Sequence, residues 1–485
     1  MIQLREDQED AVSKLRASLA EHQSSLLRAP CRWGKTVVAS YMVRRSAERR
    51  KLAIFACHRD SIFQQTSRTF DKFGVKHGYI ASGRPSNPFA FAQVASADTL
   101  RNRLHLLDKC ALLIVDEGHL WCSKTRKLII EAARAAGAKI VILTATPIRL
   151  DGKPLNEIAD DMVLGPTEEW LIENGHLAEY RVYAPVSADL TGVHTRAGDY
   201  VTSEVEERLD KPSIVGDLVT TWKKYAPGLR TVVYAISRAH GKHVLDAYLA
   251  GGVRAAYIDG ETPKAEQVRI ANALADGLIE VIVSVELMTT GYDLASLIGR
   301  DVSIQCVQLA RPTKSLQLAI QMMMRCMTKQ EGYAVILDHV NMILNRDGTR
   351  NHGFPDDERD WSLDGAQRAK KIDAGSLSIW TCEECFASVK SSKPVCPYCT
   401  KEHVVKERVI ETEEGELVQI ERDRVREIKK VETRQARDID AVAALAIERG
   451  YAPGWIAQRM KAIGKPVTFS KAMEAYAGAK MRVAA

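Results

Sequence analysis

Residues 25–36 read SLLRAPCRWGKT, a short apolar strand followed by a Gly-Lys-Thr turn that opens a helical segment. Such a turn surrounds the phosphates of a nucleotide with backbone N–H groups near Gly34, the ammonium of Lys35 and a metal-binding hydroxyl on Thr36. A Gly-Lys-Thr alone also occurs by chance at ordinary helix starts. The segment therefore predicts a phosphate-binding loop, and a second element is needed to support it.

A second apolar strand, ALLIV at residues 111–115, leads directly into Asp116-Glu117-Gly118-His119. At the end of such a strand, Asp116 can hold Mg²⁺ through its waters, and Glu117 can orient and deprotonate the water that attacks a terminal phosphate. An Asp-Glu-x-His sequence by itself is more often a solvated loop. The two elements together, each after a buried type of strand, predict hydrolysis of a nucleoside triphosphate.

The composition is that of a globular protein with two or three domains. The chain has 485 residues, and its apolar content of 46% excludes a disordered chain. The formal net charge of +6 is compatible with a polyanionic partner but does not identify one. No apolar stretch reaches the length of a membrane span, and the N-terminus has no signal-peptide pattern. We therefore expect a cytoplasmic protein with no membrane partner.

The pattern of apolar segments predicts two α/β lobes in tandem. In residues 1–165 short apolar strands alternate with amphipathic helices, which is typical of a parallel sheet that binds ligands beyond the carboxyl ends of its strands. Residues 205–345 repeat the alternation without a phosphate loop, so we expect the nucleotide in the cleft between the lobes. Strands are expected near residues 25–29, 52–56, 92–95, 111–115, 139–144, 231–235, 255–258, 280–285, 302–307 and 334–337.

Three further segments complete the predicted organisation. Residues 166–204 are expected to form a short helix and a connector between the lobes. Residues 403–436 are densely charged with both signs, which is typical of a solvated helix or a linker. Residues 437–485 have helical spacing that is interrupted at Gly450 and Pro453, which predicts a small helical pair as a tail.

Four of the ten cysteines predict a zinc site. They form two Cys-x-x-Cys pairs within residues 375–402, separated by ten residues. That spacing brings four thiolates onto one Zn²⁺ as the two knuckles of a zinc ribbon. The alternative, a redox motif, would place a single Cys-x-x-Cys at a helix start in an α/β unit. The predicted ligands are Cys382, Cys385, Cys396 and Cys399.

With these residues assigned, the chain resembles the superfamily 2 helicases, in the bacterial and phage DEAD/DEAH-box branch related to excision-repair helicases and restriction translocases. The resemblance covers about residues 4–345 and implies RecA-like lobes, ATP and Mg²⁺ as cofactors and nucleic acid as partner. It implies nucleotide binding by Arg5, Gln8, Gly34, Lys35, Thr36, Asp116, Gly291 and Asp293. It implies contact with nucleic acid, or coupling to it, by His58, Arg59, Thr99, His119, Thr144, Thr146 and Thr290.

In the second lobe, Gln321 and Arg325 align with the last helicase motif. The resemblance implies that Arg325 reaches across the cleft and neutralises charge that develops on the transferred phosphoryl group. The catalytic set that follows is Lys35, Asp116, Glu117, Gln321 and Arg325. Three positions depart from the family pattern, with Arg32 and Met324 in place of glycines and Thr328 in place of an arginine.

We predict from these observations an ATP- and Mg²⁺-dependent nucleic-acid translocase, and specifically a DNA helicase. The three departures leave open a second function, a nucleic-acid-binding protein with a weakened or lost ATPase. An RNA helicase is the third. DNA is favoured over RNA by the resemblance alone, because no residue pattern separates the two.

Overall fold

The computed structural model describes residues 3–149, 152–184, 192–196, 199–288, 294–300, 302–345, 351–365, 379–382, 384–390, 395–402, 438–448, 453–463 and 465–484. Thr290, Gly291 and Asp293 lie outside the described residues, as do residues 403–436. The chain divides into two compact units, Met1–His403 and Val404–Ala485. None of the described helices is long and apolar enough to cross a membrane.

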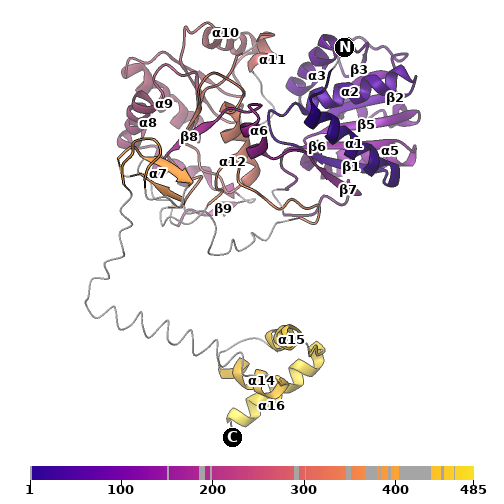
Figure 1. Cartoon of the computed structure of the whole chain (residues 1–485), viewed down its shortest axis with the longest axis vertical. Helices are drawn as coiled ribbons and strands as arrows, with labels where there is room; N and C mark the ends of the chain where they lie inside the picture. The colour runs from indigo at the N-terminus through magenta and orange to yellow at the C-terminus, as the bar shows by residue number, and fades with distance from the viewer. Residues whose placement is uncertain are drawn as a thin grey trace. The chain divides into compact units, whose positions relative to one another are not determined.

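Lobe 1 is built on a seven-stranded, fully parallel sheet with the order β3-β4-β2-β5-β6-β1-β7 (Figure 1). Strands such as Leu52–Cys57 and Lys139–Thr144 are almost continuously apolar, because helices cover both faces of a parallel sheet. The strands are β1 (Ser24–Arg28), β2 (Leu52–Cys57), β3 (Gly78–Ile80), β4 (Ala92–Ser96), β5 (Cys110–Asp116), β6 (Lys139–Thr144) and β7 (Asp161–Leu164). The helices are α1 (Glu6–Glu21), α2 (Lys35–Glu48), α3 (Asp60–Lys72), α4 (Ala97–Leu100) and α5 (Lys124–Ala135), with 3-10 turns η1 (Leu104–Leu107) and η2 (Gly118–Cys122).

The strand order of lobe 1 brings the two nucleotide motifs together. The phosphate loop follows β1 and the Asp-Glu pair follows β5, and β6 lies between these two strands. All three strands run in the same direction, so their carboxyl ends meet at one edge of the sheet. The sequence prediction of a parallel sheet with both motifs at this edge is confirmed.

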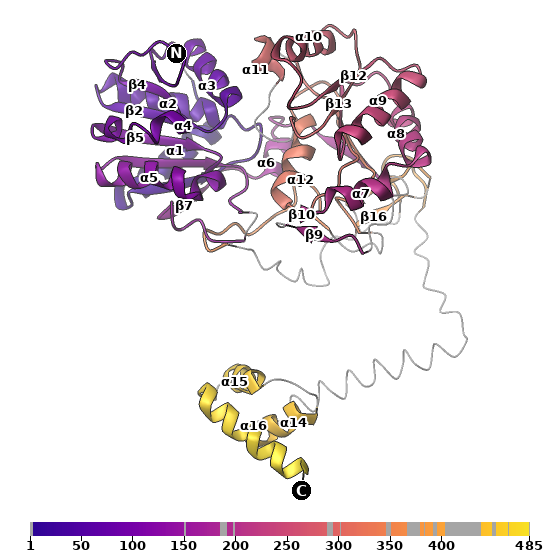
Figure 2. The same cartoon turned by 180° about the vertical axis from the view of Figure 1, so that it is seen from behind.

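Lobe 2 is built on an eight-stranded sheet with the order β12-β13-β11-β14-β15-β8-β17-β16. Its strands are β8 (Tyr180–Tyr183), β11 (Thr231–Tyr234), β12 (Ala255–Ile258), β13 (Val281–Ser284), β14 (Cys306–Leu309), β15 (Ala334–Asp338), β16 (Ile379–Thr381) and β17 (Ala387–Lys390). The helices from the connector onward are α6 (Glu168–Glu173), α7 (Thr202–Leu209), α8 (Pro212–Tyr225), α9 (Arg238–Ala250), α10 (Lys264–Ala275), α11 (Leu294–Ile298) and α12 (Leu316–Met323), followed by η3 (Met324–Cys326) (Figure 2). A small hairpin pairs β9 (Thr195–Arg196) with β10 (Asp199–Tyr200).

Strand β14 lies further along the chain than the sequence predicted. The apolar run favoured residues 302–307, whereas pairing with both neighbours starts at Cys306 and continues to Leu309. The buried Gln308 interrupts the apolar pattern inside the strand. Its side chain is satisfied by Tyr248 and His339, so a polar residue is accommodated in the sheet.

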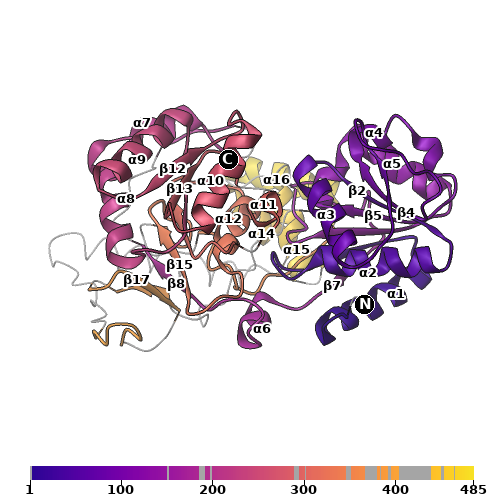
Figure 3. The same ribbon diagram turned by 90° about the horizontal axis from the view of Figure 1, so that it is seen from above.

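The sheet of lobe 2 extends into both the connector and the cysteine-rich segment. Strand β8 comes from the connector and pairs in parallel with β15, so the connector contributes more than the short helix expected. On its other side β8 pairs antiparallel with β17, which lies between the two cysteine pairs (Figure 3). The cysteine-rich hairpin is therefore continuous with the lobe 2 sheet.

The segment 351–365 connects lobe 2 back to lobe 1. Near its start, His352 Nε2 lies 2.7 Å from the carbonyl of Thr313 in lobe 2. Near its end, the carbonyl of Leu363 accepts a hydrogen bond from the backbone of Leu155 in lobe 1. The centroid of the Trp361 ring lies 4.9 Å from Cζ of Arg28, the last residue of β1.

Among its described residues, the second unit contains three helices: α14 (Ile439–Glu448), α15 (Pro453–Ala462) and α16 (Phe469–Ala484). They enclose a small apolar core that includes Val442, Ile456 and Ala472. The sequence predicted a pair, because Pro453 was interpreted as a break. Proline instead occupies the first turn of α15, where its missing N–H breaks no helical hydrogen bond.

Candidate nucleotide-binding site

The phosphate loop, residues 29–34, joins β1 to the start of α2 at Lys35. Gly34 has a φ of +104°, and a Cβ there would lie 2.8 Å from Nε2 of Gln8. Both the backbone conformation and the close approach therefore require glycine. The ammonium of Lys35 donates to the carbonyls of Ala29 and Pro30 at 3.1 and 3.0 Å, which holds it across the loop. Thr36, half-buried, follows in the first turn of α2.

Arg32 occupies the left-handed region, with a φ of +66°. The loop keeps the backbone conformation that favours glycine, and an arginine adopts it instead. For an L-residue this conformation costs roughly 1–2 kcal/mol. This conformation explains why the family has glycine at the position of Arg32. Arg32 changes the residue type but keeps the backbone conformation of the loop.

The start of α1 holds the loop through Trp33. The Trp33 ring is buried, and its Nε1 donates to Oδ2 of Asp7 at 2.5 Å. The Trp33 carbonyl accepts from Nε2 of Gln8 at 3.1 Å and from Nη2 of Arg5 at 3.2 Å. Burial works to raise the pKa of Asp7, but the hydrogen bonds from Arg5 and Trp33 outweigh it and the pKa is lowered. Arg5 and Gln8, predicted to bind the nucleotide, are placed against the phosphate loop.

The two carboxylates follow β5 in a constrained turn. Glu117 has a φ of +54°, and a Cβ on Gly118 would lie 2.3 Å from the side chain of Ile142, which explains the glycine. Burial raises the pKa of Asp116, the charge of Glu117 raises it further, and Lys35 opposes the rise. The pKa of Glu117 is also raised by burial, against the charges of Lys35 and Arg59. The pair is thus destabilised in its charged form unless a cation is present.

The same carboxylates fit a magnesium ion. Within the described part of the chain, Oδ1 of Asp116 and Oε2 of Glu117 are buried and have no hydrogen-bond partner. Carboxylate and hydroxyl oxygens are the hard ligands that Mg²⁺ prefers, and it keeps several waters when bound. Asp116 and Thr36 are the residues that would hold the ion, which would supply positive charge to the phosphates of a nucleotide.

A tight turn after β6 lies beside these motifs. Thr144 and Thr146 are both fully buried, and the Thr144 hydroxyl bonds to the backbone N–H and carbonyl of Thr146 at 3.2 and 3.1 Å. The Thr146 hydroxyl is buried without a partner among the described residues. The predicted coupling motif therefore lies at the same sheet edge as the phosphate loop.

His119, at the same edge of the lobe 1 sheet, contacts lobe 2. Its Nε2 lies 2.6 Å from Nε2 of Gln317 on α12, and its Nδ1 lies 3.6 Å from Oε2 of Glu117. Burial lowers the pKa of His119 to about 4, so the ring is neutral at pH 7. Sequence reasoning did not identify Gln317. The available signal was its spacing of four residues before Gln321, which places both on one helix face.

Arg325 lies in η3 of lobe 2, directly after α12. Its Nη2 donates to the carbonyl of Met288 at 3.0 Å, and its Nε is buried without a partner in the described segments. Burial raises the pKa of the Cys31 thiol in the loop, and the charges of Lys35 and Arg325 oppose that rise. Oε1 of Gln321, one turn before, is likewise buried and without a partner there.

Three predicted nucleic-acid contacts follow the neighbouring strands β2 and β4. His58 and Arg59 come after β2, Thr99 lies on α4 directly after β4, and these strands pair in parallel to their ends. Arg59 is exposed and Thr99 is half-buried. Burial, followed by the charges of Arg126 and Arg59, lowers the pKa of His58 to about 3. A neutral ring with two nitrogens that lack partners among the described residues lies beside an exposed arginine.

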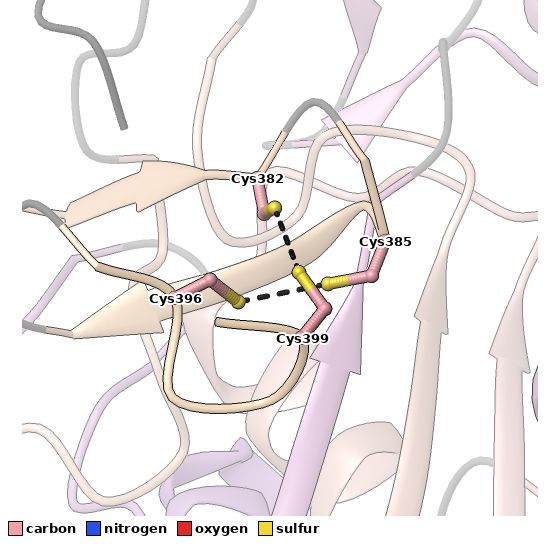
Figure 4. A group of neighbouring side chains, drawn as sticks. All are labelled: Cys382, Cys385, Cys396 and Cys399. Carbon is pink, nitrogen blue, oxygen red and sulfur yellow. Dashed lines mark hydrogen bonds between the residues drawn. The ribbon is translucent and has the colours of Figure 1, made fainter. Parts of the chain in front are cut away.

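The cysteine cluster has the geometry of a four-thiolate metal site. All four sulfur atoms lie within 4.8 Å of one another (Figure 4). The Cys382–Cys399 and Cys385–Cys396 pairs are 3.5 and 3.6 Å apart, too far for disulfides and close to the ~3.8 Å edge of a tetrahedron with Zn–S bonds of about 2.3 Å. The cluster therefore fits Zn²⁺.

The two cysteine knuckles also repeat one backbone arrangement. The residue after each pair, Phe386 or Thr400, has a positive φ, of +54° or +59°. Its N–H donates to the carbonyl of the first cysteine in the same pair, at 2.8 Å for Phe386 and 2.9 Å for Thr400. Two equivalent turns thus present their thiols to one point, as the spacing predicted.

Two family models match the chain. One, described as the res subunit of type III restriction enzymes, matches residues 1–149. The other, described as the helicase conserved C-terminal domain, matches residues 210–329. The first match contains the phosphate loop and the Asp-Glu pair, and the second contains Gln317, Gln321 and Arg325.

Individual relatives support the same assignment. A 51.5 kDa protein of a Lactococcus phage (isolate 7-9) is 31% identical over 405 residues, which cover 83% of each chain. IRC3 of Saccharomyces cerevisiae, whose name describes an ATP-dependent helicase, is 24% identical over 343 residues. That match covers 66% of this chain and 49% of IRC3, so the chain spans about half the length of that relative.

A solved structure shares the fold. It is that of the ATP-dependent type ISP restriction-modification enzyme LlaBIII bound to DNA, with a TM-score of 0.51 and 15% sequence identity. The similarity covers 70% of this chain and 28% of that enzyme. Tandem RecA-like lobes are therefore confirmed as the fold of the first unit.

Proposed function

Because the chain belongs to the superfamily 2 helicases, we propose that it is a nucleic-acid-stimulated ATPase that translocates along DNA. The family supplies the coarse activity, an ATP-dependent helicase. The observation that carries the proposal is the meeting of the two lobes at one point. His119, next to Glu117 of lobe 1, contacts Gln317 of lobe 2, and Arg325 follows Gln317 in η3 at the end of α12.

Each of these residues has a separate role in the proposed hydrolysis of ATP. Lys35 and the N–H groups at the start of α2 bind the phosphates, and Asp116 with Thr36 would hold Mg²⁺. Glu117 orients the attacking water and takes its proton, since burial raises the pKa of its carboxylate and thereby favours uptake of a proton. Arg325 neutralises charge on the terminal phosphate. Neither lobe alone carries all four functions.

Nucleic acid is proposed to lie over the carboxyl ends of β2 and β4, where His58, Arg59 and Thr99 lie together. Backbone contacts of this kind carry little sequence information, which suits movement along any strand. His119 is central to coupling, because its ring lies between Glu117 and α12 of lobe 2. A shift of α12 on nucleic-acid binding would therefore alter the surroundings of the catalytic base.

DNA is proposed as the substrate on two supports. The family model of lobe 1 is named after a restriction-enzyme subunit, and restriction enzymes act on DNA. The structure with the shared fold is described as bound to DNA. We further propose one Zn²⁺ in the cysteine cluster, where the four thiolates would hold it and the ion would stabilise the hairpin of β16 and β17.

The deciding experiment is ATP turnover by the full chain without nucleic acid and with single-stranded DNA, double-stranded DNA or RNA. We expect DNA to increase turnover at least tenfold, and Lys35→Ala to abolish the increase. Stimulation by RNA alone would establish an RNA helicase instead. Tight DNA binding with no turnover in any condition would establish a nucleic-acid-binding protein whose ATPase has been lost.

A further inference from the structure

Arg28 is a buried arginine at the last position of β1, directly before the phosphate loop. It is 3% exposed, and a buried charge is costly unless it is paired. Its Nη2 lies 2.5 Å from Oε1 of Glu168, which is 4% exposed, and its Nε donates to the carbonyl of Ala145 at 3.1 Å. The guanidinium also lies over the ring of Trp361. One side chain therefore contacts three separate segments of the chain.

Two of these three partners lie on the segments that join the lobes. Glu168 is the first residue of α6, in the connector between β7 of lobe 1 and β8 of lobe 2. Trp361 belongs to segment 351–365, which returns from lobe 2 to lobe 1. Ala145 instead lies in the turn after β6, at the sheet edge of the phosphate loop. Arg28 is thus the place where both connections meet that edge.

The connector continues from α6 to the segment that carries Arg325. Leu177 forms an isolated antiparallel bridge with Thr328. The N–H of Ala178 donates to the carbonyl of Met327 at 3.1 Å. Both lobe 2 partners directly follow η3, which contains Arg325. A continuous series of contacts therefore runs from the phosphate loop, through the buried ion pair and the connector, to the arginine of lobe 2, and such networks can carry energetic coupling between sites.

Stability alone does not require charges at this place. When a buried ion pair is replaced by apolar residues of similar volume, the folded state is often as stable as before or more stable. The guanidinium adds fixed direction, because its planar group donates to separate acceptors at set angles. It holds Glu168 and Ala145 at one relative position, whereas apolar side chains would let α6 shift against the turn after β6.

We propose that Arg28 is a positioning residue, which acts through Glu168 and the connector to set Arg325 against the nucleotide bound by lobe 1. The inference rests on the proposed ATPase function, in which Arg325 neutralises charge during hydrolysis. Arg28 itself does not need to touch the nucleotide, because its side chain is engaged with Glu168 and Ala145. Its loss is therefore expected to reduce turnover and to leave ATP binding by Lys35 and the phosphate loop in place.

The test replaces the whole ion pair in the full chain, as Arg28→Met with Glu168→Leu, so that no charge is left buried without a partner. The melting temperature is expected to fall by less than about 5 °C. The nucleic-acid-stimulated kcat for ATP is expected to fall about tenfold, while KM for ATP changes less than about twofold. The control is Arg44→Met with Glu48→Leu, the same exchange at a more exposed ion pair on α2, which is expected to change neither constant.

A second readout separates positioning from a merely structural role. Adding Arg325→Ala to the variant without the ion pair is expected to cost little more turnover than Arg325→Ala alone, because Arg28 acts through Arg325. Additive losses would contradict the inference. Arg28→Lys keeps a charge beside Glu168 but lacks the planar group, so it is expected to recover only part of the lost turnover.

The outcomes distinguish this inference from the proposed function. Wild-type kcat in a folded variant without the ion pair would overturn the inference and leave the ATPase function standing. If that variant does not fold, Arg28→Lys decides, and wild-type kcat in Arg28→Lys would overturn the inference equally. No turnover by wild type and by the Arg44 control, with any nucleic acid, would instead overturn the proposed function and the inference with it.

Discussion

His119 of lobe 1 and Gln317 of lobe 2 lie 2.6 Å apart between their Nε2 atoms. With the Gln317 amide as donor, Nε2 of His119 is the acceptor and its Nδ1 carries the proton. Nδ1 of His119 lies 3.6 Å from Oε2 of Glu117, beyond hydrogen-bond distance. We infer that Gln317 of lobe 2 sets the tautomer of His119 of lobe 1, next to Glu117, the proposed general base.

Replacing Gln317 by Leu is expected to lower DNA-stimulated kcat about tenfold with little change in KM for ATP. The substitution leaves the phosphate loop intact, but His119 loses the partner that fixes its tautomer, a loss on the scale of ~1.4 kcal/mol. Steady-state kinetics checks this, and a double variant with His119→Ala should be no slower than the slower single variant. Additive losses in the double variant would show that the two side chains act independently.

Replacing Asp116 by Asn is expected to stabilise the metal-free, nucleotide-free protein at high pH. The pKa of Asp116 is raised to about 7, against ~3.9 for an unfolded chain, so the folded state binds more protons between these values. Stability of wild type therefore falls as pH rises from about 4 to 7, and Asn removes that loss. The gain should be roughly 2–4 kcal/mol at pH 8 and close to zero at pH 4.

Urea unfolding in the presence of a chelator, at both pH values, measures this difference. Asp246→Asn is the control, because Asp246 is exposed on α9. A variant no more stable than wild type at pH 8 would contradict the buried charge at Asp116. Addition of Mg²⁺ and ATP should stabilise wild type more than the variant, since the carboxylate is then needed.

Replacing Asp7 by Ala is expected to loosen the phosphate loop. The indole of Trp33 would lose its acceptor while staying buried, which typically costs about 1–3 kcal/mol. ATP should also bind more weakly, because the loop would no longer be held by α1. Asp10→Ala is the matched control, since Asp10 is 58% exposed in its ion pair with Lys14 and should cost less than about 0.5 kcal/mol. Unfolding curves and ATP titrations distinguish the two variants.

Replacing Cys399 by Ser is expected to remove the bound zinc and to lower the melting temperature. Three remaining thiolates would hold Zn²⁺ less tightly, and we expect the hairpin that pairs with β8 to depend on the proposed ion. Metal analysis should find about one equivalent of zinc in wild type and in Cys122→Ser, a half-buried cysteine outside the cluster. Full zinc content in Cys399→Ser would show that the four sulfurs do not form one site.

Much of the fold could be predicted because its signals are local. Strands such as Leu52–Cys57 are apolar runs bounded by polar residues, and α2 begins at a glycine followed by Lys35, so periodicity and end signals agreed. The pairing of β17 with β8 joins residues about two hundred positions apart. No local pattern encodes such a pairing, because it depends on which sheet edge remains free after the lobe has folded.

The candidate site, like the fold, could be predicted only in part. Motifs located Lys35, Asp116 and Glu117, whose chemistry demands particular residue types at fixed spacings. Gln317 and Asp7 were not predicted because their partners, His119 and Trp33, lie far away in the sequence, and the spacing of Gln317 to Gln321 does not by itself reveal that contact. Thr290, Gly291 and Asp293 remain predictions.

The return of segment 351–365 to lobe 1 changes the mechanics of the first unit. Besides the connector before β8, the chain reaches lobe 1 again at Leu363 and rejoins the lobe 2 sheet at β16. Two lobes that are joined by one chain segment can rotate about it in any direction. Two lobes that are joined at two separate places keep only the rotation about the line through both connections. We therefore expect the proposed closing of the lobes around ATP to be confined to one axis, so that it would return His119 to the same glutamine.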